Sequence, residues 1–390
     1  MFPTKHGSLV FYVLILALYL IGAGGTSFYD EHASRKGNRN GAAKKRTRSC
    51  QYNNVFDGSG ELIEPYTRYE DCSLITMANE QLTDAHAVKL AKALHKMKGL
   101  EALYLHYNKI GDEGFDAIAT GIRGLNLYMV NFRKNLLGDP GMKALALSFQ
   151  HMTRLTYINL SGNRIGNSAK NLRKALSKSA LLQDLQLHGN KMDDEAILGV
   201  MDGLSNGETN KGYFRKLTIG GNPDMTQMGC LSLAQKVGKL VFLDTLGLSG
   251  IKIDKKCMAI LSISLFKLKE LLELYLNHCN LEEESLNVLG YSVSSQEKLN
   301  RLDIAGNPGI LSNDEKLVKF GKHLVNSSTL HDVNMKGGLF SFDFLKRAFP
   351  SIFGESIAEK IENCARDWSR QNKACALLRN TPAGNSAMDL

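Results

Sequence analysis

The sequence predicts an α/β solenoid, a curved array with parallel strands on its concave face and helices on its convex face. The first observation is a recurring motif: in "LEALYLHYNKIGDEG", residues 100–114, leucines and isoleucine stand at fixed distances around Asn108. The same spacing returns in "LTYINLSGNRIG", "LQDLQLHGNKM" and "LNRLDIAGNPGI". The second observation is the helical pattern that follows these copies. Self-similarity at such a period is the signature of a repeat architecture.

Aligning the copies on the asparagine gives ten repeats, 27 to 32 residues apart. The aligned positions are Glu80, Asn108, Asn135, Asn163, Asn190, Asn222, Ile251, Cys279, Asn307 and Gly338. Each unit of a repeat array packs only on its neighbours, so the core grows along one axis. A chain of 390 residues with 43% hydrophobic content can therefore form one elongated domain, although compact globules usually divide at this size.

Each repeat has the pattern of a short strand, a turn and a helix. Leu103 and Leu105 alternate with residues that point the opposite way, as in a strand. Segments such as "DEGFDAIATGI" and "NDEKLVKFGKHL" carry apolar residues three and four apart behind acidic starts, which suit a helix N-terminus. Parallel strands stack at about 4.8 Å, whereas packed helices need about 8–10 Å. The array is therefore expected to curve with the strands inside.

The asparagine meets a need of the turn that follows each strand. A buried unpaired polar group costs roughly 1–3 kcal/mol, and a side-chain amide supplies both a donor and an acceptor. We therefore predict a structural ladder formed by Asn108, Asn135, Asn163, Asn190, Asn222, Cys279 and Asn307. Ile251 and Gly338 occupy the same position without a hydrogen-bonding side chain, and local loosening is expected beside them.

The pattern L-x-x-L-x-L-x-x-N-x-I/L, followed by "GDEG" or "TDAH" and a helix, resembles the leucine-rich repeats of the ribonuclease-inhibitor type. Repeats of this type also occur in NOD-like receptors and in the activator of the Ran GTPase. The resemblance covers roughly residues 72–340, and cysteine in place of the asparagine is a substitution that the family also uses. The resemblance implies a horseshoe whose concave face and loop rims bind a protein partner.

The two ends of the chain predict an exported protein. Residues 1–25 combine Lys5, an apolar run and a stretch of small residues, the layout of a signal peptide; an uncleaved signal anchor is the alternative. Residues 26–50 form a basic flexible linker with a net charge of +5, which is either plainly solvated or in contact with acidic polymers or lipids. We assign 51–340 to the repeats, 341–378 to a C-terminal helical cap and 379–390 to a disordered tail. No segment after the leader is apolar enough to cross a membrane.

The seven cysteines fit an oxidising route, and their spacing does not indicate zinc. Two pairs near the ends of the array are candidate disulfides that would staple it, namely Cys50 with Cys72 and Cys364 with Cys375. The central cysteines are expected to be buried small apolar residues, namely Cys230, Cys257 and Cys279. An odd count leaves at least one thiol free.

Two sequons are candidate glycosylation sites, Asn159 in "NLS" and Asn326 in "NSS". Asn326 is the better candidate because the side chain of Asn159 is expected to face the concave surface. Catalytic signatures are missing from the sequence: it has no G-x-S-x-G, phosphate-loop or H-E-x-x-H motif, and its histidines are scattered. We therefore predict no catalytic residue, metal or cofactor.

The functional prediction accordingly rests on the outward positions of the strands. An aromatic and basic group near the N-terminal end has the composition of interface hot spots, and a charged group lies near the C-terminal end. The candidate partner-binding residues are Tyr104, His106, Tyr107, Arg133, Tyr157, His188, Glu273, Tyr275, Arg301 and Asp303.

The leading hypothesis is a non-enzymatic, secreted or secretory-pathway module that binds a protein partner. One alternative is an intracellular regulator resembling the Ran GTPase activator or a NOD-like receptor fragment, against which the signal peptide argues. The other is a surface adhesive protein that binds anionic polymers through its basic linker. Specific nucleic-acid binding is not predicted.

Overall fold

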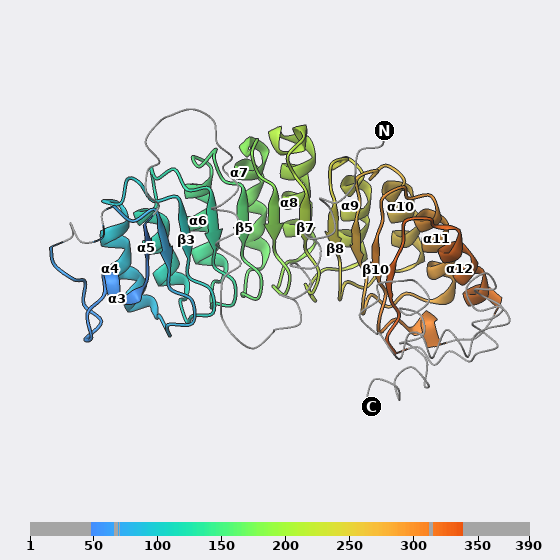
Figure 1. Ribbon diagram of the computed structural model, residues 1–390, viewed down its shortest axis with the longest axis horizontal. Coiled ribbons are helices and arrows are strands. Elements are labelled where there is room, and N and C mark those ends of the chain that lie inside the picture. The colour runs from blue at the N-terminus through green and yellow to red at the C-terminus, as the bar shows by residue number, and fades with distance from the viewer. Residues whose placement is uncertain (1–47, 66–68, 70, 312–314, 338–390) are drawn as a thin grey trace, which may run out of the picture. The chain divides into compact units, whose positions relative to one another are not determined.

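A computed structural model describes residues 48–65, 69, 71–311 and 315–337, all within one unit of the chain, Thr47–Leu390. This part contains a single sheet of 11 strands, paired in chain order from β1 to β11 and parallel throughout (Figure 1). The strands are β1 Ser49–Cys50, β2 Leu74–Thr76, β3 Ala102–Tyr104, β4 Met129–Asn131, β5 Tyr157–Asn159, β6 Asp184–Gln186, β7 Lys216–Thr218, β8 Thr245–Gly247, β9 Glu273–Tyr275, β10 Arg301–Asp303 and β11 Asp332–Asn334. Ten of them, β2 to β11, come from the ten predicted repeats, so the α/β solenoid is confirmed.

The strands stack in register, which places equivalent residues of successive repeats side by side. Leu103 at the centre of β3 lies between Ile75 of β2 and Val130 of β4, and all three are buried. Burying one such side chain stabilises a fold by roughly 1.5–3 kcal/mol. The central row faces the helices and forms the core, while the first and last residue of each strand face the opposite side. We call that opposite side the open face.

One helical segment follows each strand from β2 to β10 and covers the other side of the core. The helices are α4 Asp84–Leu94, α5 Asp112–Gly121, α6 Asp139–Phe149, α7 Leu172–Lys178, α8 Asp194–Asn206, α9 Gln227–Val237, α10 Lys255–Leu265, α11 Glu283–Ser294 and α12 Glu315–Asn326. A short helix, α3 Tyr52–Val55, and three 3-10 segments complete the order, namely η2 Asn167–Asn171, η3 Glu208–Lys211 and η4 Pro308–Leu311.

Acidic residues at the start of one helix also accept hydrogen bonds from the start of the helix in the next repeat. The carboxylate of Asp112, the first residue of α5, accepts hydrogen bonds from the backbone N–H groups of Gly138 (2.7 Å) and Gly141 (3.1 Å) at the start of α6. Asp194 does the same for Thr226 and Gly229 of the following repeat. Helix N-termini leave N–H groups without partners, so each acidic side chain caps the helix one repeat later.

The asparagines from Asn108 to Asn222 form a zigzag of buried hydrogen bonds. Asn163 donates to the carbonyl oxygens of Leu160 (2.9 Å) and Phe132 (3.0 Å), and its own oxygen accepts from the N–H of Leu137 (3.1 Å). The carbonyl of Leu160 also accepts from Asn190 at 3.1 Å. A strand-end carbonyl in this part of the ladder thus lies between the amides of two successive asparagines.

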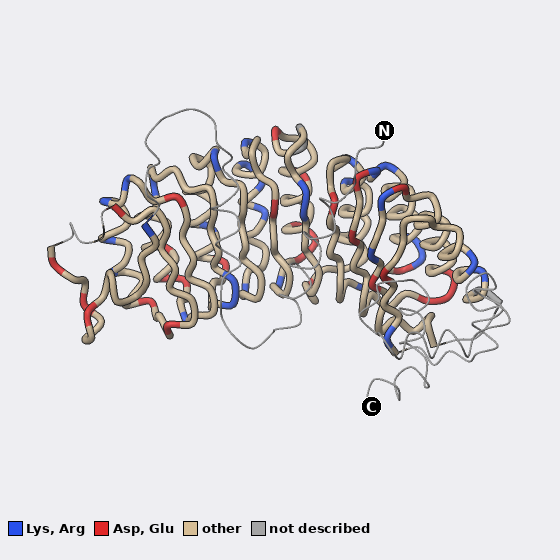
Figure 2. Tube along the Cα trace, viewed as in Figure 1, with Lys and Arg blue, Asp and Glu red and all other residues tan. Residues whose placement is uncertain are grey.

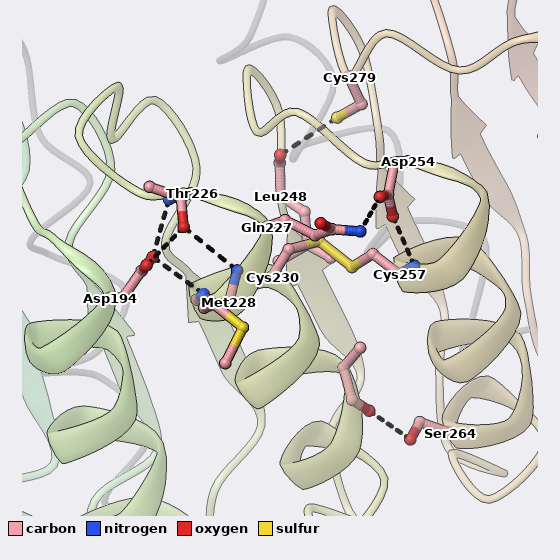
Figure 3. Close-up of a disulfide and its surroundings, with 12 residues drawn as sticks. Asp194, Thr226, Gln227, Met228, Cys230, Leu248, Asp254, Cys257, Ser264 and Cys279 are labelled. Atoms are coloured by element: carbon pink, nitrogen blue, oxygen red, sulfur yellow. Dashed lines mark hydrogen bonds between the residues drawn. A yellow bond between two sulfur atoms is a disulfide. The ribbon is translucent and has the colours of Figure 1, made fainter.

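The zigzag is interrupted at Ile251, where a disulfide joins the two flanking helices. Cys230 of α9 is bonded to Cys257 of α10 (Figure 3); our expectation that these cysteines are unpaired was wrong. They lie in the first turns of adjacent helices, and the stacking of the repeats brings their sulfurs together. Cys279 is a buried free thiol whose sulfur donates to the carbonyl of Leu248 at 3.2 Å. The loosening expected near Ile251 stays a prediction.

The N-terminal end of the sheet begins two residues earlier than the predicted repeat boundary. β1 pairs with β2 and lies inside the range that we assigned to the linker, and Cys50 forms a disulfide with Cys72. Val55 and Phe56 are buried in the same core. The signal peptide, most of the linker, Gly338, the cap with Cys364 and Cys375, and the tail lie outside the described residues. None of the described helices has the length and apolar character needed to cross a membrane.

Candidate protein-binding surface

The turn after each strand carries one residue in left-handed backbone conformation, directly before the ladder position. In the repeats of Asn163 and Asn190 this residue is glycine, with φ of 69° and 70°. In the two repeats before them it is Tyr107 (φ 58°) and Lys134 (φ 56°). A side chain in this conformation costs roughly 1–3 kcal/mol and marks candidate functional positions. The N-terminal edge of the open face therefore presents side chains where the next four repeats have glycine, before His278 takes this position in the repeat of Cys279.

A compact group of cationic and aromatic side chains surrounds these two residues. The guanidinium carbon of Arg133 lies 5.4 Å from the centre of the Tyr107 ring, and the ring of His106 meets the same tyrosine edge-on at 5.8 Å. Tyr107 is 45% exposed. We call His106, Tyr107, Arg133, Lys134 and His188 the rim cluster.

The rim cluster carries positive charge that the described residues do not neutralise. Neither Arg133 nor Lys134 forms an ion pair with any residue that the structure describes. Burial and the charge of Arg133 lower the pKa of His106, and burial with Arg133 and Lys134 lowers the pKa of His188. Figure 2 shows acidic and basic residues interspersed along the described chain; at this edge the cations lie beside the exposed ring of Tyr107.

Two predicted binding residues take a more internal place than expected. Tyr104 is 2% exposed because its ring folds onto β4, where the hydroxyl donates to the sulfur of Met129 at 3.1 Å. Tyr157 is partly buried, and its hydroxyl accepts from the side-chain amide of Asn159 at 3.1 Å. The sequence correctly indicates the direction of an outward residue, but it does not indicate how neighbouring side chains cover it.

The two sequons differ in accessibility. Asn159 is 3% exposed, and its amide nitrogen also donates to Gln186 at 3.0 Å. A glycan on that nitrogen would break both hydrogen bonds and would not fit the folded open face. Asn326 is exposed at the end of α12, so it stays the better candidate for glycosylation.

The predicted C-terminal group is brought together but neutralises itself. The guanidinium of Arg301 lies 5.5 Å from the ring centre of Tyr275 and pairs with Asp332 at 3.3 Å. The hydroxyl of Tyr275 donates to Glu273 at 2.9 Å, and Asp303 accepts from the backbone of the turn that follows it. These charges bind one another across strands β9 to β11, and they leave less to offer a partner than the rim cluster does.

Asp184 is a functional candidate that the sequence reasoning did not single out. It is the first residue of β6, and one of its carboxylate oxygens is buried with no hydrogen-bond partner among the described residues. The other oxygen accepts from Gln186 at 3.0 Å. Burial raises the pKa of Asp184 to about 6, although the nearby charge of Lys216 opposes the rise. A lone acidic residue at an outward strand position is the only signal for this in the sequence.

Other site chemistry is not indicated within the described part of the chain. No group of three or more His, Cys, Asp or Glu side chains there is arranged to hold a metal ion. Burial raises the pKa of the free thiol of Cys279 to about 12. A thiol in that state is a poor nucleophile at neutral pH, since the thiolate is the reactive species.

Comparison with known protein families agrees with this architecture. The family model described as "Leucine Rich repeat" matches residues 99–119 and 151–169. With ten recurring copies and the parallel sheet, these matches identify the chain as a leucine-rich-repeat protein, an architecture whose extended strand surface binds proteins. An internalin of known crystal structure from Listeria monocytogenes aligns over 71% of this chain and 78% of its own, with 16% identity and a TM-score of 0.39. No curated protein sequence matches the chain.

Proposed function

We propose that this protein is an exported, non-enzymatic binding module that recognises an acidic region of a protein partner through the rim cluster. The observation that carries the proposal is the pair of unneutralised cations, Arg133 and Lys134, beside the exposed ring of Tyr107. Tyrosine and arginine are the residues most often found at interface hot spots. Lysine, by contrast, supplies a point charge that favours encounter with an acidic surface.

The geometry of the cluster prepares it for such a partner. Stacking on Tyr107 holds the guanidinium of Arg133 in place, so that less side-chain freedom is lost on binding. Arginine can then accept a carboxylate in a bidentate manner. The two histidines make binding at this site depend on pH. In the free protein, burial and nearby cations lower the pKa values of His106 and His188. A bound acidic ligand would raise both pKa values again, because it favours the charged form of each ring. Binding is therefore expected to tighten as the pH falls from 7 toward 6.

The repeat itself supplies a matched test of this surface. Tyr107→Gly with Lys134→Gly restores the residue that other repeats use at a left-handed position, so folding should be preserved. His278→Gly makes the same change at a position with φ of 56° in the repeat of Cys279, away from the rim cluster, and is the control.

The assay is chemical cross-linking of the tagged protein to its partner in culture medium or at a cell surface, with quantification of the cross-linked partner by mass spectrometry. We expect the His278→Gly control to recover the partner as wild type does. The Tyr107→Gly/Lys134→Gly variant should recover it with roughly tenfold lower affinity, which corresponds to about 1.4 kcal/mol. Equal recovery by both variants would contradict the assignment of the rim cluster.

Export rests on the leader and on cysteine chemistry. Disulfides persist in oxidising compartments, and the described residues form two, Cys50–Cys72 and Cys230–Cys257. We propose cleavage of the leader near residue 25. Mass spectrometry of the protein from medium and from lysate, with and without reduction, should find a disulfide-bonded form in the medium that starts near residue 26. A cytosolic form with an intact leader and reduced cysteines would instead favour the intracellular regulator.

The adhesive alternative has its own test, because it assigns binding to the linker. Deleting residues 35–48 would abolish binding to heparin if the basic linker were the adhesive element. Under our proposal the same deletion leaves recognition of the protein partner by the rim cluster unchanged.

A further inference from the structure

The helical side of the array contains a hollow that the strand surface does not explain. It has a volume of about 600 Å³ and lies among α6, α7 and α8. Its lining includes Lys143 and Leu147 of α6, Arg173 and Lys174 of α7, and Asp202 of α8. The predicted binding surface, in contrast, lies on the open face.

The hollow arises from an irregular helix in the repeat of Asn163. This repeat begins with the 3-10 segment η2, which is tighter than an α-helix, and continues as the short helix α7. The segment packs closely on α8, where a Cβ added at Gly199 would lie 2.7 Å from the Cα of Lys170, and one at Gly203 would lie 2.7 Å from the carbonyl oxygen of Arg173. The 3-10 segment η2 packs on both α6 and α8, whereas α7 packs extensively on α8 and only slightly on α6. Space therefore opens between α6 and α7.

The charges around the hollow are mostly positive and only partly neutralised. Lys143 and Lys174 form no ion pair with any residue in the described ranges. Arg173 lies 3.6 Å from Asp202, whose carboxylate is held more closely by Lys236 at 2.8 Å. Arg173 can thus turn to a new anion while Asp202 keeps a partner.

An apolar side chain lies among these cations. Leu147 is 54% exposed, off the face of α6 that carries the buried Leu145 and Phe149. An exposed leucine alone is ordinary, but here it borders a hollow with basic walls. A sulfated or phosphorylated polymer would satisfy the cations and leave the leucine unused, whereas a peptide can satisfy both.

We propose that this hollow is a second interaction surface, which binds an acidic peptide segment that carries an apolar side chain. Carboxylates of the segment pair with Lys143, Lys174 and Arg173, and its apolar residue covers Leu147. The surface belongs to different elements from the rim cluster, so the two can bind independently. A partner could then be held on the helical side while the open face engages another.

The test uses the full chain and a fluorescently labelled peptide rich in glutamate with interspersed leucine. Two further peptides are measured in parallel, one with glutamine in place of glutamate and one with serine in place of leucine. The main variant is Lys143→Glu with Lys174→Glu, both exposed. Lys92→Glu with Lys256→Glu makes the same change in net charge at exposed positions of α4 and α10 and is the matched control. A third variant, Leu147→Ser, removes the apolar contact, and thermal unfolding checks that each variant is folded.

We expect fluorescence anisotropy to show that the main variant binds the peptide at least about tenfold more weakly than wild type, with the control within about twofold. Leu147→Ser should weaken binding of the leucine peptide and leave the serine peptide unaffected. An equal loss of peptide affinity in the control variant would overturn the proposal, because it would show diffuse charge attraction. A loss of peptide affinity only in an Arg133→Glu/Lys134→Glu variant would also overturn it, because the peptide would then bind the rim cluster. The hollow would instead be assigned to an anionic polymer if the protein bound heparin and not the peptide, and if heparin binding required Lys143 and Lys174 but not Leu147. The Tyr107→Gly/Lys134→Gly variant should bind the peptide like wild type, whatever the fate of the rim proposal.

Discussion

Replacing one asparagine of the ladder tests how the repeats are held together. Asn163→Ala removes four buried hydrogen bonds, three from its amide nitrogen and one to its oxygen. The longest, at 3.5 Å, goes to the carbonyl of Ser161, which keeps its bond from the N–H of Lys134. The carbonyl of Leu160 keeps its bond from Asn190, and that of Phe132 keeps a bond from Asn135 at 3.1 Å. Only the N–H of Leu137 loses its partner entirely.

The expected magnitude follows from this count. A buried N–H without a partner costs about 1–3 kcal/mol, and each remaining bond contributes about 0.5–1.5 kcal/mol net. Because the two carbonyls keep one bond each, we expect Asn163→Ala to lower the free energy of unfolding by about 3 kcal/mol. If the neighbouring asparagines did not share these carbonyls, the substitution would leave three buried groups unpaired, namely the N–H of Leu137 and the carbonyls of Leu160 and Phe132. The cost would then be roughly 3–9 kcal/mol.

The assay is urea unfolding followed by circular dichroism, with hydrogen exchange at individual amides. Asn126→Ala, an exposed loop asparagine, is the control and should change the free energy of unfolding by less than about 0.5 kcal/mol. Exchange in Asn163→Ala should speed up first at Leu137 and its neighbours. A variant as stable as the control, or exchange that rises evenly across the array, would refute the role of the ladder.

Two further predictions concern the open face and the interrupted repeat. Burial raises the pKa of Asp184 to about 6 from 3.8, so the folded state binds a proton there more readily than the unfolded state, and the ionised form lowers stability above pH 6. Asp184→Asn should therefore raise stability at pH 7.5 by up to roughly 3 kcal/mol, with the gain falling away between pH 6 and 4; a gain that is equal at pH 4 and 7.5 would contradict the assignment. Cys230→Ala with Cys257→Ala opens a link across 27 residues and should cost about 3.5 kcal/mol in non-reducing urea unfolding, whereas the difference from wild type should vanish in excess dithiol.

Much of the candidate surface could be anticipated from the repeat pattern, because the pattern gives the direction of each strand residue. Arg133 is predicted to face outward in this way, and its guanidinium does lie against the ring of Tyr107 in the turn of the preceding repeat. Tyr104 shows the limit: its direction was right, but its ring folds onto Met129 and is buried. The disulfide between Cys230 and Cys257 spans 27 residues, whereas the repeat step from Asn222 to Ile251 is 29. The shared period therefore does not point to this pair, and the packing of α9 on α10 decides it.

The sequence by itself determined the repeat, its register and the asparagine ladder. These are properties of a one-dimensional stack, in which each unit meets only the copy before it and the copy after it, so a periodic pattern specifies the contacts. Only the tertiary structure decided which charges stay unpaired and where the surface is hollow. Those depend on how residues from different repeats pack on one another. Lys236 pairs with Asp202, η2 packs on Gly199, and α7 packs on Gly203. Contacts of this kind vary from copy to copy, and the shared period cannot encode them.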